Sequence, residues 1–279
     1  MKSFQGKVAA ITGAGSGIGR ALALQLAREG ASLALSDINL ADVQETANQA
    51  QALGATVHVA QLDVANRDAV FQWADDVVAH YGQANLIFNN AGVALNASVE
   101  GITFDEFEWL MNINFWGVVA GTKAFLPHLI AAGDGHIINI SSLFGLVCVP
   151  NLVAYNTSKF AVRGFTETLR EELDIMKNGV SASSVHPGGI NTNISRNSRT
   201  GVSAGDLIGD PEKAKADFQK VHRTPPEEAA RVILRGVKRN ERRIIVGNDA
   251  RIIDFAQRIF GSSYQALVAR GSASMRKKG

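Results

Sequence analysis

The chain has 279 residues, of which 46% are hydrophobic and 19% are charged, and its formal net charge is +2. This size and composition allow one large core, and the small net charge excludes the strong positive field that nucleic-acid binding requires. The single cysteine, Cys148, excludes an internal disulfide.

Short apolar runs rich in β-branched residues alternate with longer amphipathic stretches. This alternation predicts strands at 8–12, 32–36, 56–62, 85–90, 136–141, 180–186 and 243–247. The predicted helices span 18–29, 40–53, 67–80, 104–131, 153–177 and 226–239. Continuous apolar strands separated by helices predict an α/β protein with a parallel sheet covered on both faces. Right-handed crossovers then give a doubly wound sheet of about seven strands in a single domain, 1–279.

Two segments depart from this alternation. Residues 191–222 are polar and rich in Gly and Ser, which beside the strand ends is typical of a substrate-binding loop or lid. Residues 248–279 form a C-terminal extension in which apolar residues recur near helical spacing, namely Ile252, Ile253, Phe255, Ala256, Ile259 and Phe260. This spacing predicts an amphipathic helix that packs within the chain or between subunits, with contact to a membrane surface as the alternative.

No further feature indicates a membrane span or a metal. No window approaches the roughly 18 uncharged apolar residues of a spanning helix. The start of the sequence lacks the apolar core of a signal peptide, and a lone cysteine fits a reducing compartment, so we expect a cytoplasmic protein. The six histidines form no close ligand pair in the sequence, so no metal site is expected.

A glycine-rich segment, "ITGAGSGIGRAL", joins the first predicted strand to the first helix. Glycines let a pyrophosphate approach the backbone, and a helix N-terminus attracts phosphate. The glycines stand at every second position, which differs from the G-x-G-x-x-G of many dinucleotide folds, and a tight turn without ligand is the alternative. The position after the first strand favours a cofactor site made by Gly13, Ser16, Gly17, Ile18 and Gly19.

Asp37 ends the second strand, 18 residues after Gly19. An acid at this place hydrogen-bonds the hydroxyls of the adenosine ribose and repels a 2′-phosphate. No basic residue stands at Ser16 or Ile38 to compensate, which favours NAD over NADP. Arg20 is near the loop, but we expect it to lie on the helix surface. Asp63 follows the third strand. It either accepts a hydrogen bond from the adenine amino group or starts a turn.

Tyr155 and Lys159 lie four residues apart in a predicted helix, so they share one face. On its own, this spacing is more typical of a surface pair. At a separation of about 4 Å and an effective dielectric near 20, however, the ammonium would favour phenolate by roughly 4 kcal/mol. That corresponds to about three pKa units. The pair therefore predicts a tyrosine that titrates near neutral pH and is suited to acid–base chemistry.

Seven segments occur in one order, namely "TGAGSGIG", "LDV", "NNAG", "NINFWG", "ISS", "YNTSK" and "HPGGINT". In this order they resemble the short-chain dehydrogenase/reductase family over about residues 5–247. The resemblance implies a Rossmann-fold oxidoreductase that binds NAD or NADP and acts on a small molecule. It also implies a homodimer or homotetramer in which helices 104–131 and 153–177 pair between subunits.

The resemblance implies a role for each matching residue. Tyr155 is expected to be the general acid/base and Lys159 its helper. Ser142 is expected to donate a hydrogen bond to the substrate oxygen, with Ser141 as the alternative.

Asn114 is expected to hold a water next to the lysine, with Asn112 as the alternative. The residues that the resemblance places along the cofactor are Asp63, Val64, Asn90, Ala91, Gly92, Tyr155, Lys159, Pro187, Gly188, Ile190 and Thr192.

The substrate pocket is expected among loops after the fourth, fifth and sixth strands. Its candidate residues are Val93, Leu95, Asn96, Ser142, Leu143, Phe144, Val149, Leu152, Tyr155 and Ile194. Most are apolar, which favours a moderately hydrophobic secondary alcohol or ketone. Arg196 and Arg199 could instead meet a carboxylate or phosphate. Cys148 is expected to be a small buried hydrophobe near the pocket, and His186 to serve structure.

Three other functions are compatible with this fold. The Tyr-x-x-x-Lys pair also serves sugar-nucleotide epimerases and dehydratases, but about 30 residues after the last strand are too few for their substrate domain. An NADP-dependent carbonyl reductase would use the same residues with the other cofactor. A non-catalytic NAD(H)-sensing protein predicts a missing catalytic group, and none of the four is missing.

Overall fold

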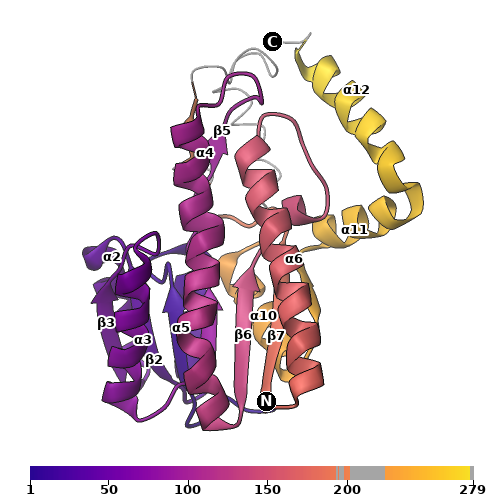
Figure 1. The fold of residues 1–279 in the computed structure, drawn as a ribbon. Coiled ribbons are helices and arrows are strands. Elements are labelled where there is room, and N and C mark those ends of the chain that lie inside the picture. Colours follow the sequence, from indigo (N-terminus) through magenta and orange to yellow (C-terminus); the bar gives the residue numbers. More distant parts are fainter. Residues whose placement is uncertain (193, 195–197, 202–223, 277–279) are drawn as a thin grey trace.

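The computed structural model describes residues 1–192, 194, 198–201 and 224–276. Its main sheet has seven strands in the order β3-β2-β1-β4-β6-β7-β9, and every neighbouring pair is parallel. The strands are β1 (Val8–Thr12), β2 (Ser32–Asp37), β3 (Val57–Gln61), β4 (Leu86–Asn89), β6 (Gly135–Ile140), β7 (Val180–Pro187) and β9 (Arg243–Val246). The predicted doubly wound parallel sheet is confirmed (Figure 1).

Helices cover both faces of the sheet because successive strand side chains point to opposite sides. Ala9 and Ile11 of β1 face one apolar cluster, whereas Val8 and Ala10 face the other. The first cluster is closed by α1 (Gly17–Arg28), α2 (Leu40–Ala52) and α10 (Pro226–Lys238). The second is closed by α3 (Arg67–Tyr81), α5 (Gly117–Ala132) and α6 (Val153–Met176).

The order of strands reverses between β1 and β4. The connection after β1 leads outward to β2, whereas the connection after β4 leads the other way to β6. At such a switch point the loops at the carboxyl ends of the strands diverge and leave a crevice for a ligand. The glycine-rich loop and the "NNAG" segment therefore lie on the two sides of this crevice.

The predicted helix 104–131 consists of α4 (Phe104–Met111), a π-helical turn (Asn112–Trp116) and α5. Thr103 and Glu106 form a capping box at its start. By length and composition the stretch Phe104–Ala132 could cross a membrane, a criterion that core helices also meet. Because α5 packs against β4 and β6, this stretch is a core helix of the sheet.

A small two-stranded sheet and a 3₁₀ turn were not predicted, whereas a helical C-terminal extension was. The strand β5 (Leu95–Asn96) pairs with β8 (Arg199–Thr200) in a separate two-stranded sheet. A 3₁₀ turn covers Leu143–Gly145. The C-terminal extension forms α11 (Asn248–Phe260), a 3₁₀ turn (Gly261–Ser263) and α12 (Tyr264–Arg276), which project from the sheet as an arm (Figure 1). Most of the predicted lid, 191–222, lies outside the described residues.

Candidate active site

The glycine-rich loop between β1 and α1 packs too closely against neighbouring backbone to accept a side chain at two of its glycines. Gly13 has φ +65, and a Cβ there would come within 2.8 Å of the Ala91 Cα. A Cβ at Gly19 would come within 2.1 Å of the Gly13 carbonyl oxygen. Ser16 is the N-cap of α1, yet its side chain does not cap the helix. The first N–H groups of α1 therefore suit a pyrophosphate.

The end of β4 is joined to this loop by hydrogen bonds. The Asn90 amide donates to the carbonyl oxygens of Thr12 and Gly13, both at 3.0 Å. The Thr12 hydroxyl accepts from the backbone N–H groups of Asn90 and Ala91, at 3.0 and 3.1 Å. The Asn90 side chain thus shapes the loop, and the place of Asn90 and Ala91 along a cofactor stays a prediction.

The acid at the end of β2 also contacts the loop. The Asp37 carboxylate accepts from the backbone N–H groups of Gly15, at 2.9 Å, and Asn39, at 3.0 Å. Arg20 does not lie on the helix surface as expected, because its guanidinium donates to the Gly15 carbonyl and to the Thr46 hydroxyl. The backbone of Gly15 therefore contacts both a carboxylate and a guanidinium.

Asp63 occupies the turn before α3. Its carboxylate accepts from the backbone N–H of Ala65 at 2.9 Å. This is the turn-starting role that the sequence left open beside adenine recognition, and Val64, buried against α5, follows it.

The π-helical turn places one asparagine inside the protein. Asn114 is fully buried, whereas Asn112 is exposed. The Asn114 amide accepts from the Val93 N–H at 2.8 Å and donates to the Val93 carbonyl at 2.9 Å. A Cβ at Gly92 would lie 3.2 Å from the Asn114 Oδ1 and 3.6 Å from the Lys159 Nζ. The side chain thus fixes the turn after β4 beside the lysine, and the water it was expected to hold stays a prediction.

Two consecutive serines at the end of β6 point to different partners. The Ser142 hydroxyl lies beside the Tyr155 phenol, where it lowers the pKa of that phenol, and it accepts from the Phe144 N–H at 3.1 Å. Ser141 instead donates to the backbone carbonyl of Lys159 at 2.8 Å. Of the two candidates, Ser142 is therefore the one beside the phenol.

Lys159 is 3% exposed and lies one helical turn after Tyr155. Its Nζ donates to the Ile140 carbonyl at 3.0 Å and lies 5.6 Å from the centre of the Tyr155 ring. Burial lowers the pKa of Lys159 to about 8. Burial also raises the pKa of Tyr155, and the hydrogen bond with Ser142 opposes this rise.

The direction of the Tyr155 pKa corrects the expectation from helical spacing alone. That expectation placed the ammonium about 4 Å from the phenol and assigned a pKa near neutrality. In the structure both groups are withdrawn from water, which disfavours the charged form of each. The lysine also directs its ammonium at a backbone carbonyl. Their mutual attraction is therefore not the dominant influence on either pKa.

His186 of β7 holds the backbone of Ser142 by a hydrogen bond. It is fully buried, and its Nδ1 lies 2.9 Å from the Ser142 carbonyl oxygen. Because a carbonyl only accepts, Nδ1 carries the proton and Nε2 accepts from the Ser184 hydroxyl at 2.9 Å. Burial lowers the pKa of His186 to about 4. The ring is thus a neutral support, as the sequence predicts.

The turn after β7 closes the crevice on the other side. Gly188 donates to the Val246 carbonyl at 2.9 Å, and the Thr192 N–H donates to the Ile190 carbonyl at 2.8 Å. The Thr192 methyl faces Gly17, because a Cβ at Gly17 would lie 3.1 Å from it. Thr192 therefore lies opposite the glycine-rich loop, and Pro187, Gly188 and Ile190 precede it in the chain.

Asp249, in the first turn of α11, was missed by the sequence analysis. Its carboxylate accepts from the Gly189 N–H at 2.6 Å, and a Cβ at Gly188 would come within 2.3 Å of the same oxygen. The sequence signal for this residue, an acid in the first turn of a helix, predicts a helix start but not a partner. Asp249 thus holds the turn that faces the crevice.

The wall beyond Ser142 is apolar. Leu143 packs with Leu146, Val147 and Ala250, and Phe144 lies edge-on to the Tyr155 ring at 6.4 Å between centroids. Val149 is partly exposed nearby in the chain.

Tyr264 of α12 supports this wall, because its hydroxyl lies 3.0 Å from the Cys148 N–H that donates to it. Cys148 is exposed and not the buried hydrophobe that was expected. Cys148 is exposed because it lies on the solvent side of this apolar wall.

Of the two arginine candidates for substrate recognition, Arg199 is not directed at the phenol. The Arg199 guanidinium stacks on the Trp109 ring, 3.8 Å from its centre. Arg196 lies outside the described residues. Among the described residues no group of three or more His, Cys, Asp or Glu could hold a metal ion, although His58 and His80, distant in sequence, stack with ring centres 5.0 Å apart.

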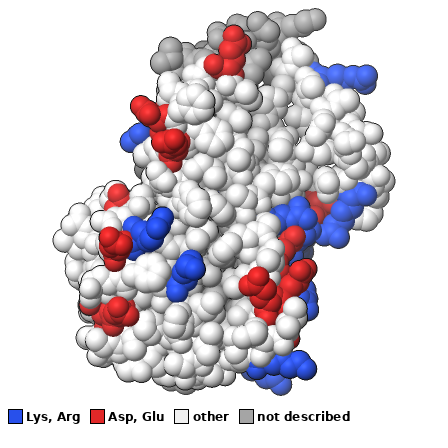
Figure 2. All heavy atoms as spheres, in the orientation of Figure 1, with Lys and Arg blue, Asp and Glu red and all other residues white. Residues whose placement is uncertain are grey.

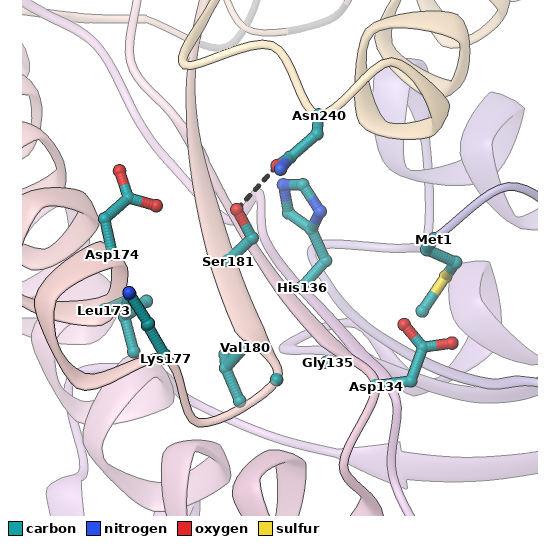
Figure 3. Close-up of a pocket in the computed structure, with 11 residues that line it drawn as sticks. Met1, Asp134, Gly135, His136, Leu173, Asp174, Lys177, Val180, Ser181 and Asn240 are labelled. Atoms are coloured by element: carbon teal, nitrogen blue, oxygen red, sulfur yellow. Dashed lines mark hydrogen bonds between the residues drawn. The ribbon is translucent and has the colours of Figure 1, made fainter.

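A cavity of about 250 Å³ lies at the opposite end of the sheet (Figure 3). It is lined at the amino ends of β6 and β7 by His136 and Ser181, and the Ser181 hydroxyl donates to Asn240 at 2.6 Å. Because Ser142 and Tyr155 stand at the carboxyl ends of the strands, this cavity is not part of the candidate site.

Known proteins resemble both the sequence and the fold. Residues 7–203 match the family model described as short chain dehydrogenase. The chain is 52% identical over 275 residues to the protein named putative oxidoreductase SadH of Mycobacterium tuberculosis. This match covers 98% of this chain and 98% of that protein. It is 32% identical to estradiol 17-beta-dehydrogenase 11 of Homo sapiens over 96% of this chain and 84% of that protein.

Among solved structures, a short chain dehydrogenase/reductase of Burkholderia phymatum in complex with NAD is 30% identical. Its TM-score is 0.80, and the match covers 88% of this chain and 90% of that one.

Proposed function

The chain belongs to the short-chain dehydrogenase/reductase family, and from this premise we propose that it transfers a hydride between NAD and a moderately hydrophobic secondary alcohol or ketone. The observation that carries the proposal is the contact between Ser142 and Tyr155 beside a buried lysine, at the carboxyl ends of the strands. Bound NAD would supply the hydride acceptor and a positive charge next to the phenol.

We assign the proton chemistry to Tyr155. Its Oη takes the hydroxyl proton of the alcohol in oxidation and returns a proton to the ketone oxygen in reduction. Ser142 donates its hydroxyl hydrogen to the substrate oxygen and so orients it. Lys159 favours phenolate by its positive charge, and the nicotinamide charge acts in the same direction. Together these two cations offset the burial that raises the tyrosine pKa.

The cofactor would lie between the glycine-rich loop and the turn after β7. The N-terminus of α1, which the Ser16 side chain leaves uncapped, supports binding of the pyrophosphate there. The Asp37 carboxylate supports NAD over NADP, because it would repel a 2′-phosphate. The NAD complex of the Burkholderia phymatum relative is consistent with this choice.

The proposed substrate class rests on the apolar wall at Leu143, Phe144 and Val149. A relative named as an estradiol dehydrogenase supports an apolar alcohol. We also propose a homodimer or homotetramer in a cytoplasmic setting. Partner contact at the helices 104–131 and 153–177 is supported by Trp116 and Phe160, which are 50% and 36% exposed on their outer surface.

Turnover assays with a panel of secondary alcohols test the proposal, with NAD and NADP compared and reduced nicotinamide followed by absorbance. Tyr155→Phe is expected to lower kcat by about 10²–10⁴-fold while NAD binding persists. Tyr81→Phe is the matched control, because its phenol donates to the Leu33 carbonyl away from the site. NAD binding without turnover of any alcohol or ketone by the parent protein would instead support the sensing function.

A further inference from the structure

Helix α11 turns its apolar side to solvent. Ala250 and Asp254 are buried, whereas Ile252, Phe255 and Ile259 are 68%, 67% and 62% exposed. These three residues are spaced three and four apart, so they form one stripe along the helix. A surface helix of a globular protein normally buries such a stripe. The stripe is therefore a surface that is left without a partner among the described residues.

Polar contacts hold α11 in this orientation. Asp254 accepts from the Arg258 Nε at 2.9 Å and lies 3.8 Å from the Arg243 guanidinium of β9. Asp249 accepts from the Gly189 N–H at 2.6 Å. Rolling the helix to bury its stripe would break the contact of Asp254 with Arg243 and that of Asp249 with Gly189, whereas the pair of Asp254 and Arg258 lies within the helix.

The charge of the arm is one-sided. Residues 248–279 carry six basic and two acidic side chains, although the whole chain has a net charge of only +2. The two acids are the ones held by the body, whereas Arg251, Arg258 and Arg270 are exposed. Figure 2 shows a largely uncharged surface over the arm, with basic side chains at its margins. An apolar stripe flanked by arginine is the pattern of a helix that lies in a membrane interface.

We propose that the arm formed by α11 and α12 docks on an anionic lipid surface. Ile252, Phe255 and Ile259 enter the boundary between headgroups and acyl chains, and the exposed arginines meet the lipid phosphates. A second copy of the chain fits this face less well. In a two-fold pairing of the stripes, the arginines beside one stripe would meet those beside the other.

Docking is independent of hydride transfer, but it has a consequence for the site. Asp249 of α11 holds the turn after β7, and Tyr264 of α12 contacts the segment that follows Ser142. The arm on the lipid therefore brings the turn after β7 and the segment after Ser142 near the membrane surface.

Vesicle flotation of the full chain tests the proposal. Vesicles of phosphatidylcholine with phosphatidylglycerol are compared with vesicles of phosphatidylcholine alone. The parent protein is expected to float with the anionic vesicles and to be released by salt. Replacing Phe255→Ser together with Ile259→Ser should lower the partition coefficient by roughly tenfold or more. Ile175→Ser is the matched control, because Ile175 is 78% exposed at the end of α6 and should leave binding unchanged.

Arg251→Glu supplies a second test that does not depend on the apolar stripe. It should weaken binding to the anionic vesicles, and it carries the test if the double variant fails to fold. The proposal is overturned if the parent does not float, or if the double variant or Arg251→Glu floats as well as the parent. It is also overturned if light scattering without lipid shows that the double substitution dissociates an oligomer, because the stripe would then lie between copies.

Discussion

Lys159 is expected to make the folded protein less stable at neutral pH. Burial lowers its pKa from 10.5 to about 8. At about 1.4 kcal/mol per pKa unit, this difference costs the folded state about 3 kcal/mol while the lysine is charged. Lys159→Met removes this cost. It also leaves the Ile140 carbonyl without its hydrogen-bond donor, which destabilises the variant by about 1–2 kcal/mol. The variant should therefore be inactive, yet about 1–2 kcal/mol more stable at about pH 7.

The pH dependence identifies the cause. Below about pH 8 the lysine is protonated in both the folded and the unfolded chain, so the cost is present in full. Between pH 8 and 10.5 the unfolded chain binds more protons, and the stability of the parent rises relative to the variant.

Urea unfolding of both proteins at about pH 7 and about pH 9.5 should show the stability of the variant relative to the parent falling by about 2 kcal/mol, so that the advantage of the variant is lost or reversed. Titrations of other groups are common to both proteins and cancel in the difference. A gap that stays constant over this range, or a variant less stable than the parent at about pH 7, would refute the reasoning.

Three further substitutions test the crevice and the core. Asp37→Ala should raise the ratio of kcat/KM with NADP to kcat/KM with NAD by about tenfold or more. The acid that repels a 2′-phosphate is then gone, while Arg20 remains. An unchanged ratio would show that Asp37 does not contact the ribose. Asp249→Ala should raise the KM for NAD by roughly fivefold, because the hydrogen bond to Gly189 is lost. Asp249→Asn keeps an acceptor and should resemble the parent. Equal KM values for the two variants would contradict this role. Gly121→Ala should lower the free energy of unfolding by about 2 kcal/mol or more, because its Cβ would come within 2.1 Å of the Asn89 Oδ1. In the control Gly164→Ala no atom lies within 4 Å of the added Cβ, and a comparable loss there would rule out the clash as the cause.

The sheet could be predicted from the sequence because its strands are buried on both faces. Runs such as "VAAIT" at Val8–Thr12 are continuous and apolar, and only a covered parallel sheet accommodates several of them. The order of the strands follows from long-range pairing and was not predicted beyond the doubly wound class. The site residues that follow strands were placed at one edge for the same reason, since parallel strands end together.

Other features depend on contacts that no local pattern contains. The period of α11 predicts an amphipathic helix, but its orientation is set by Asp254 with Arg243 and by Asp249 with Gly189. Arg20 was expected on the surface because its hydrogen-bond partner, Thr46, belongs to α2. The pKa of Tyr155 was misjudged because helical spacing gives a separation but not the degree of burial.

The adjacent serines at the end of β6 divide two tasks. Ser141 ties the strand to the backbone of α6 at Lys159, while His186 holds the carbonyl of Ser142 from β7. The spatial relation between phenol, hydroxyl and amine is thus imposed by bonds to main-chain atoms that take no part in proton transfer. Replacing a reacting side chain leaves these backbone hydrogen bonds in place. Inserting one residue at the strand end would exchange the positions of the two serines and break both hydrogen bonds.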